Sequence, residues 1–404
     1  MSSTPPAQPP ALPGRRRLPL GLLILIALLL AIALARANRH TALPALEAIA
    51  FSDRDHGVGL FVAGSSQHCV ASSGSTADGG AHFGTLAVLA DWRCAGSPTV
   101  SQIATDGRGD VFAYGPGLIV SHDDTATWAP ANAFGSVLAV QAAGTSVWMV
   151  TRDCLGVGSG ARPCPVRVLE SADGGRHWNP TPSQPAGAAV ARGEVGVPDA
   201  FGQTWLLRTG RSSGYVLSSA VTGDSRATLA FTSDGGFTWS RRPLPCGAGA
   251  LSTVLAAAPD GTLVAVCAGE PGVGFQAKSL AISDDGGRHW SQRGPCGAGP
   301  AAAACTRSPL SQGYLGEAVA TSPQTVYVIG DRSGLVVTRD GGGHWRNLGA
   351  TVGDVNGTPA QVAFFGPRDG TVLGRENTAQ APIAIWHTID DGHIWSVVAP
   401  SGAS

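Results

Sequence analysis

Apolar and polar residues alternate along most of this chain in short runs of about four to eight residues, bounded by Gly, Asp or Pro. Such runs predict β-strands, because successive side chains of a strand point to opposite faces. Four runs recur in each repeat, most clearly at 46–51, 59–62, 69–72 and 85–90, at 317–321, 325–329, 335–338 and 346–348, and at 360–365, 371–375, 383–387 and 396–399. The stretch 187–223 belongs to the longest repeat and has no clear first strand.

A turn motif follows the third run of every repeat. Its fullest form is Ser171-x-Asp173-Gly174-Gly175-x-x-Trp178, with close copies at 232–239, 283–290, 338–345 and 388–395 and looser copies at 76–83 and 121–128. Its seven aspartates are Asp78, Asp123, Asp173, Asp234, Asp285, Asp340 and Asp390, separated by 45, 50, 61, 51, 55 and 50 residues. A repeat of about 50 residues is typical of propellers and solenoids. We therefore predict an all-β fold, a seven-bladed β-propeller of four-stranded antiparallel blades over residues 44–400, with complete blades at both ends.

The residue types of the motif suit a structural turn. The aspartate can accept hydrogen bonds from backbone N–H groups, and the glycine pair allows backbone angles that side chains forbid. Six of the motifs end in a tryptophan, which we expect to insert between strands or blades. These six residues are Trp128, Trp178, Trp239, Trp290, Trp345 and Trp395.

These motifs resemble the Asp-box, or BNR, repeat of sialidases, sortilin-type receptors and photosystem II assembly-factor-like propellers. The nearest resemblance is to the last group, whose blade opening is similar to 50–53 before His56-Gly57 and to 363–366 before Asp369-Gly370. The resemblance covers residues 44–400, with departures at Phe83 and Thr125. It implies a scaffold role but carries no site residue to this chain, because the repeat recurs in enzymes, receptors and assembly factors.

The first 43 residues differ in kind from the repeats. We expect a disordered tail over 1–14, a signal-anchor or transmembrane helix over 15–37, and a linker over 38–43. The helix rests on an uncharged run from Leu18 to Ala35, which is long enough to cross the hydrocarbon layer. A cleaved signal peptide remains the alternative, with small-residue cleavage steps at 33–35 or 35–37. The length of the run favours the uncleaved anchor, which would hold the protein to a membrane.

The eight cysteines place the bulk of the chain outside the cytoplasm. All lie after residue 68, without a CxxC pair or the Cys/His spacing of a zinc site. An even set behind an export-type segment predicts four disulfides in an oxidising compartment, whereas buried free thiols would fit a cytosolic protein. All eight map to the face opposite the motifs, with Cys69 at the start of a third strand and Cys267 at the end of a second strand. We predict the pairs Cys154–Cys164, Cys296–Cys305, Cys69–Cys94 and Cys246–Cys267.

Charge and motif placement exclude several kinds of site. The net charge of −1 offers no basic stripe for nucleic acid. The histidines His177, His289 and His344 lie on different blades and cannot converge on one metal ion, and the glycine pairs precede no helix that could bind phosphate. We therefore expect no cofactor and no metal.

Two functions remain open. The first is a non-catalytic, monomeric scaffold, tethered to the cell membrane as a single-pass protein or secreted after cleavage. It would bind a protein or envelope polymer through the face opposite the motifs, by residues that the sequence does not identify. The second is an extracytoplasmic glycoside hydrolase with two carboxylates at the channel mouth. The Arg-Ile-Pro motif expected of a sialidase is absent, which favours the scaffold.

Overall fold

The structure is a computed structural model of the whole chain. It describes residues 44–64, 67–95, 99–131, 135–152, 164–180, 194–199, 204–218, 228–246, 250–272, 275–294, 308–331, 334–348, 357–376 and 384–400. The tail, helix and linker expected over 1–43 lie outside these residues. Within the described part, no helix has the length and apolar character needed to span a membrane.

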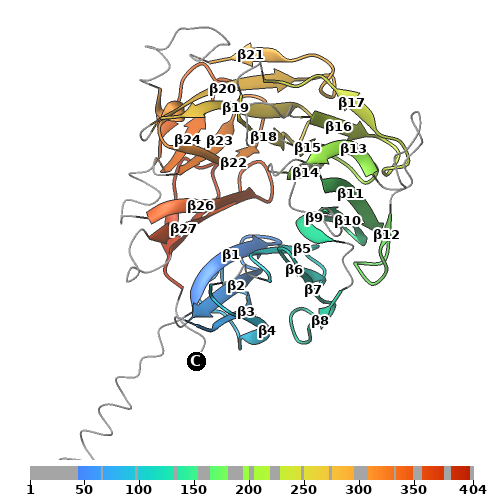
Figure 1. Cartoon of the computed structure of the whole chain (residues 1–404). Coiled ribbons are helices and arrows are strands. Elements are labelled where there is room, and N and C mark those ends of the chain that lie inside the picture. Colours follow the sequence, from blue (N-terminus) through green and yellow to red (C-terminus); the bar gives the residue numbers. More distant parts are fainter. Residues whose placement is uncertain are drawn as a thin grey trace, which may run out of the picture. The chain divides into compact units, whose positions relative to one another are not determined.

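The described strands form seven antiparallel sheets, each built from consecutive strands (Figure 1). Blade 1 contains β1 (Ala45–Phe51), β2 (Gly57–Gly64), β3 (Cys69–Thr76) and β4 (Ala87–Trp92). Blade 2 contains β5 (Gln102–Thr105), β6 (Val111–Tyr114), β7 (Leu118–Ser121) and β8 (Ala129–Pro130). Blade 3 contains β9 (Ser136–Ala143), β10 (Ser146–Arg152), β11 (Cys164–Ser171) and β12 (Asn179–Pro180).

Four more sheets follow the same order. Blade 4 contains β14 (Thr204–Arg208), β15 (Gly214–Ser218), β16 (Thr228–Thr232) and β17 (Ser240–Arg242). Blade 5 contains β18 (Ser252–Ala257), β19 (Leu263–Pro271), β20 (Gln276–Ser283) and β21 (Ser291–Arg293). Blade 6 contains β22 (Tyr314–Ala320), β23 (Val326–Asp331), β24 (Gly334–Thr338) and β25 (Arg346–Asn347). Blade 7 contains β26 (Gly357–Phe364), β27 (Gly370–Glu376), β28 (Ala384–Thr388) and β29 (Ser396–Val398).

The architecture confirms the predicted seven-bladed propeller. Blades 1 and 7 are each complete, so no strand is exchanged between the ends of the array. The stretch 187–223, which has no clear first strand in the sequence, contains three strands. β14 opens blade 4 and β15 follows it, while β13 (Glu194–Asp199) pairs with β11 as a fifth strand of blade 3.

Seven apolar clusters, one between each pair of neighbouring blades, close the ring. The cluster that joins blade 7 to blade 1 contains Leu373 and Ile385 from blade 7 with Leu46, Phe61 and Phe83 from blade 1. The other six clusters join successive blades in the same way. The first strands β1, β5, β9, β14, β18, β22 and β26 contact one another around the axis.

Hydrogen bonds from a backbone N–H of one blade to a side-chain oxygen of its neighbour connect the first strands. We call these hydrogen bonds struts. Gln141 Oε1 accepts a hydrogen bond from Arg208 N at 2.7 Å, and Gln361 Oε1 accepts one from Ile49 N at 2.8 Å. Glu317 Oε2 accepts one from Val362 N at 3.0 Å. Each strut satisfies an N–H that the neighbouring sheet leaves unpaired.

The only lysine of the chain, Lys278 on β20, is buried at the boundary of blades 5 and 6. Its Nζ donates to Gly313 O at 2.8 Å, to Gln312 O at 3.2 Å and to Gln276 O at 3.5 Å. Burial lowers the pKa of this ammonium group to about 8. Lys278 therefore fixes the linker that enters blade 6.

Candidate functional site

All seven motifs adopt one hydrogen-bonded turn. The Ser or Thr hydroxyl at position 1 donates to the aspartate Oδ1 at position 3, at 2.7–2.9 Å. The same hydroxyl accepts from the backbone N–H of position 5 at 2.7–3.0 Å. Oδ1 also accepts from the backbone N–H of position 7 at 2.7–3.0 Å. The aspartates Asp78, Asp123, Asp173, Asp234, Asp285, Asp340 and Asp390 are therefore occupied by their own turns.

Position 4 of the motif ties this turn to the turn between the first two strands of the same blade. Its backbone N–H donates to a carbonyl of that turn at 2.8–3.0 Å in blades 1, 2, 3, 4, 6 and 7. In blade 3, Gly174 N donates to Thr145 O at 2.9 Å. Both turns thus lie at one end of each blade, which we call the motif face, and the other end is the cysteine face.

Position 7 explains the motif histidines. In six blades its His or Thr side chain hydrogen-bonds the aspartate Oδ2 at 2.5–2.7 Å. Hydrogen bonds from the backbone N–H and the side chain of His82 lower the pKa of Asp78 to about 2. The same two bonds from the histidine at position 7 lower the pKa values of Asp173, Asp285 and Asp340. Each histidine caps its own aspartate, and no group of three metal-ligating side chains occurs among the described residues.

The aromatic residue at position 8 packs against the preceding blade. Trp128, Trp178, Trp239, Trp290, Trp345 and Trp395 each join the cluster between their own blade and the one before it, and Phe83 does so in blade 1. The glycine pair permits this approach. A Cβ on Gly175 would lie 2.6 Å from Phe112 of blade 2.

Among the described residues, two disulfides lie toward the cysteine face. Cys69–Cys94 joins the start of β3 to the segment after β4, and Cys246–Cys267 joins the segment after β17 to β19. Both bonds join cysteines that the sequence analysis pairs. β19 continues to Pro271, so Cys267 lies inside a strand rather than at its end. Cys154, Cys296 and Cys305 lie outside the described residues, as does the side chain of Cys164.

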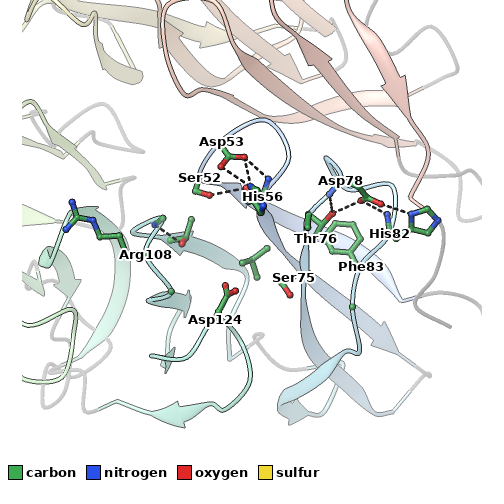
Figure 2. Close-up of a pocket in the computed structure, with 17 residues that line it drawn as sticks. Ser52, Asp53, His56, Ser75, Thr76, Asp78, His82, Phe83, Arg108 and Asp124 are labelled. Atoms are coloured by element: carbon green, nitrogen blue, oxygen red, sulfur yellow. Dashed lines mark hydrogen bonds and ion pairs between the residues drawn. The ribbon is translucent and has the colours of Figure 1, made fainter.

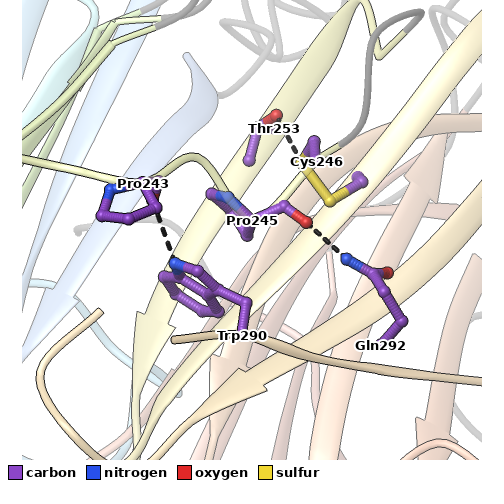
Figure 3. The surroundings of a disulfide bond; sticks show 7 residues. Pro243, Pro245, Cys246, Thr253, Trp290 and Gln292 are labelled. Carbon is purple, nitrogen blue, oxygen red and sulfur yellow. Dashed lines mark hydrogen bonds between the residues drawn. A yellow bond between two sulfur atoms is a disulfide. The ribbon is translucent and has the colours of Figure 1, made fainter. Parts of the chain in front are cut away.

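The Cys246–Cys267 disulfide is one of several bonds that join blades 4 and 5 (Figure 3). Trp290 Nε1 donates to Pro243 O at 3.0 Å, and Gln292 Nε2 donates to Pro245 O at 2.5 Å. Blade 5 therefore holds the segment leaving blade 4 through a covalent bond and two side-chain hydrogen bonds.

The first strands carry two carboxylates among the described residues, Glu47 in blade 1 and Glu317 in blade 6. Burial raises the pKa of Glu317 to about 7. Burial also raises the pKa of Tyr114 of blade 2 to about 12, and the negative charge of Glu317 adds to this rise. Glu317 is thus the described carboxyl group best suited to remain protonated near neutral pH.

A cavity of about 790 Å³ opens between blades 1 and 2 on the motif face (Figure 2). Its polar wall includes Asp53 and Asp78, which are bound within their own turns, and Asp124 at position 4 of the blade 2 motif. No sequence motif points to this cavity, because its walls come from four separate turns. It lies on the motif face, whereas the cysteine positions favour binding on the opposite face.

Comparisons with known proteins support the fold. No protein-family model and no curated protein matches the chain. Among solved structures, it is similar to YCF48 bound to D1 peptide, with a TM-score of 0.53 and 19% identity over 86% of this chain and 93% of that chain. YCF48 from Cyanidioschyzon merolae gives a TM-score of 0.50 and 16% identity over 87% of this chain and 97% of that chain.

An enzyme shares the fold as well. The GH74 xyloglucanase from Xanthomonas campestris gives a TM-score of 0.51 and 13% identity, over 89% of this chain but only 55% of the enzyme. These similarities show a propeller of the kind that the motifs predict. They do not choose between a binding protein and an enzyme, because function depends on the site rather than the fold.

Proposed function

We propose that this chain is a non-catalytic scaffold, tethered to a membrane by residues 15–37, whose propeller lies outside the cytoplasm and binds a protein partner or envelope polymer on the cysteine face. The observation that carries this proposal is the position of the disulfides Cys69–Cys94 and Cys246–Cys267. Both restrain segments near that face, where restraint lowers the entropy cost of binding. Disulfides also fit an oxidising compartment.

The similarity to YCF48 bound to D1 peptide supports a protein partner over a polymer. That structure pairs a propeller of this fold with a peptide. At 19% identity, the similarity supports peptide binding in general but identifies no binding residue of this chain.

Quantitative affinity capture from membranes tests the binding face. The intact chain is compared with a double variant of the cysteine face, Asp91→Lys with Arg93→Glu, since both side chains are exposed beside Cys94. Asp284→Lys, at an exposed position of the blade 5 motif, is the matched control on the motif face. We expect the double variant to lose its partner and the control to keep it. Equal capture by all three proteins would contradict binding at this part of the cysteine face, and no enrichment above background would contradict the scaffold itself.

Carbonate extraction tests the tether. The full-length chain should stay with the membrane pellet, and a chain without residues 15–37 should not. Release of the full-length chain into the soluble fraction would show that the segment is cleaved or does not anchor.

Glycoside hydrolysis is the second candidate, and Glu317 is the observation that favours it. A carboxyl with a pKa of about 7 can act as a general acid at neutral pH. However, Gln141 and Gln361 make the same strut to the neighbouring blade as Glu317 does, without a titratable proton. This equivalence favours a structural role. Polysaccharide hydrolysis that disappears in Glu317→Gln would reverse the preference.

A further inference from the structure

Two blades have an aspartate at motif position 4 in place of glycine. They are blade 2 with Asp124 and blade 7 with Asp391, and both have positive φ angles, 56° and 55°. Both backbone N–H groups make the usual bond to the first turn of their blade, at 3.0 Å. The two aspartates therefore start from the same backbone geometry, and each faces the blade that precedes it.

Blade 6 fills the space in front of Asp391. Arg339 Nη1 donates to Asp391 Oδ2 at 2.9 Å, and its Nη2 donates to Asp391 O at 2.6 Å. The Tyr327 hydroxyl donates to Asp391 O at 2.5 Å, and the Thr321 hydroxyl donates to Oδ1 at 2.9 Å. The interface between blades 6 and 7 is closed by this network.

Blade 1 has smaller residues at two of the three equivalent positions. Arg339 is motif position 2, which is Ala77 in blade 1. Val58 is the equivalent of Tyr327. Each lies on the second strand of its blade and pairs with the residue just before motif position 1, Val58 with Ser75 and Tyr327 with Val337.

The third position keeps its hydroxyl group. Ser52 corresponds to Thr321, because each lies at the start of the turn between the first two strands of its blade. The backbone N–H of each donates to the carbonyl oxygen of the residue four places later, His56 or Thr325. Ser52, Val58, Ala77 and Asp124 all line the cavity. The cavity therefore occupies the space that Arg339 and Tyr327 fill in the other interface.

The remaining charged groups of the cavity are accounted for. Asp53 is paired with His56 at 3.0 Å, and Asp78 is paired with His82 at 2.7 Å. Arg108 is exposed and turns away from Asp124 (Figure 2), and its Nη1 lies 3.6 Å from where a Cβ on Gly144 of blade 3 would be. Among the described residues, the Asp124 carboxylate has no hydrogen-bonding or ionic partner. Among the described lining residues, the wall thus presents the exposed Asp124 carboxylate, and the arginine of the wall, Arg108, points away from it.

We propose that this cavity binds the guanidinium group of an arginine side chain from a protein partner, with the Asp124 carboxylate as its acceptor. The fork of a guanidinium can reach a carboxylate oxygen and a backbone carbonyl at once, as Arg339 does at Asp391. A lysine ammonium group lacks this planar fork. The volume of about 790 Å³ exceeds one side chain, so residues flanking the arginine also enter. The site is on the motif face and is independent of the binding proposed for the cysteine face.

Calorimetric titration of the full-length chain in a non-ionic detergent tests the site. The probe is the peptide acetyl-Gly-Arg-Gly-amide, with the neutral citrulline peptide and the lysine peptide as comparisons. We expect saturable binding of the arginine peptide, at least tenfold weaker binding of the citrulline peptide, and weaker binding of the lysine peptide. Asp124→Asn should also weaken binding at least tenfold, and asparagine tolerates the positive φ at this position. Equal binding of the arginine and citrulline peptides, or no binding of either, would overturn the proposal.

A variant that fills the cavity gives a second readout that does not depend on Asp124→Asn folding. Ala77→Arg supplies the missing arginine in cis and should both abolish peptide binding and raise the thermal midpoint. Ala172→Arg is the matched control, because it alters the same motif position in blade 3 while blade 4 has Gly235 rather than an aspartate at position 4. It should change neither binding nor the midpoint. Unchanged peptide binding in Ala77→Arg would show that the peptide binds elsewhere.

Discussion

The interfaces between blades 1 and 2 and between blades 6 and 7 start from the same motif geometry and end differently. In both, an aspartate at motif position 4 has a φ angle near 55°, which favours glycine. In the 6/7 interface, Arg339, Tyr327 and Thr321 surround that aspartate. In the 1/2 interface, Ala77 and Val58 leave a cavity in front of it.

The difference separates two roles that the motif combines. Its internal hydrogen bonds form the turn in every blade, whatever the neighbouring blade contains. The fit between blades is decided instead by residues at motif position 2 and on the second strand of the preceding blade. Binding sites can therefore arise between blades without any loss of the turn.

Replacing each of these two aspartates by alanine should have the largest effect on stability. The loss should be greater in the 6/7 interface than in the 1/2 interface. Asp391→Ala removes charge-assisted hydrogen bonds and leaves Arg339 without its carboxylate, while Asp124→Ala removes only an unpaired carboxylate. Both place alanine at a positive φ. We expect the free energy of unfolding to fall by about 3 kcal/mol for Asp391→Ala and about 1 kcal/mol for Asp124→Ala, measured by urea denaturation. Equal losses would mean that the 6/7 network contributes no net stability.

Glu317→Gln extends the comparison to the struts around the axis. The pKa of Glu317 is raised to about 7, so the folded state holds its proton more tightly than the unfolded state does. Stability from this group is present below about pH 4.5 and is lost as pH rises toward 7. We therefore compare the free energy of unfolding of Glu317→Gln with that of the parent at each pH. The difference, variant minus parent, should be about 2 kcal/mol larger at pH 8 than at pH 5. A constant difference across this range would show that Glu317 titrates normally.

The interface that closes the ring should respond to pH in the opposite direction. His387 of blade 7 donates from Nε2 to Gly79 O of blade 1 at 2.7 Å, and its Nδ1 lies 3.1 Å from the Thr371 hydroxyl. Burial lowers the pKa of His387, with a smaller contribution from Arg54, while the Gly79 carbonyl and Asp55 oppose the shift. The unfolded chain therefore binds the proton first, and stability should fall as pH drops below about 6.5. Urea midpoints in a Glu317→Gln background measure this fall, and His387→Gln should reduce it.

Ile394→His should have the smallest effect. Blade 7 is the one motif in which position 7 is apolar, and the Ile394 side chain is 72% exposed. A histidine there would cap the second oxygen of Asp390, as His82 caps Asp78. Because the site is exposed, we expect a gain of only about 0.5 kcal/mol, seen as a higher thermal midpoint. Ile389→His is the control and should give no gain, because Ile389 is exposed and lies at motif position 2, from which no described side chain in the other blades hydrogen-bonds the position 3 aspartate.

The sequence predicted the blade number and the strand order because one motif recurs at a fixed place in every repeat. The strands of blade 6 begin and end within three residues of the expected runs. The histidine caps were also within reach, since His177 lies four residues after Asp173 and has the donor that Oδ2 needs. The open interface was not predicted, because it depends on pairing position 4 of one repeat with position 2 of the repeat before it. Comparing Ala77 with Arg339 in that register would have revealed it.

The burial of Lys278 has a practical consequence for chemical labelling. Apart from the amino terminus of the chain, its Nζ is the only primary amine of the protein, and three backbone carbonyls enclose it. Amine-reactive dyes and cross-linkers should therefore leave the folded propeller unlabelled. Once the boundary between blades 5 and 6 opens, the amine becomes reactive, so label incorporated at this residue measures how often that boundary opens.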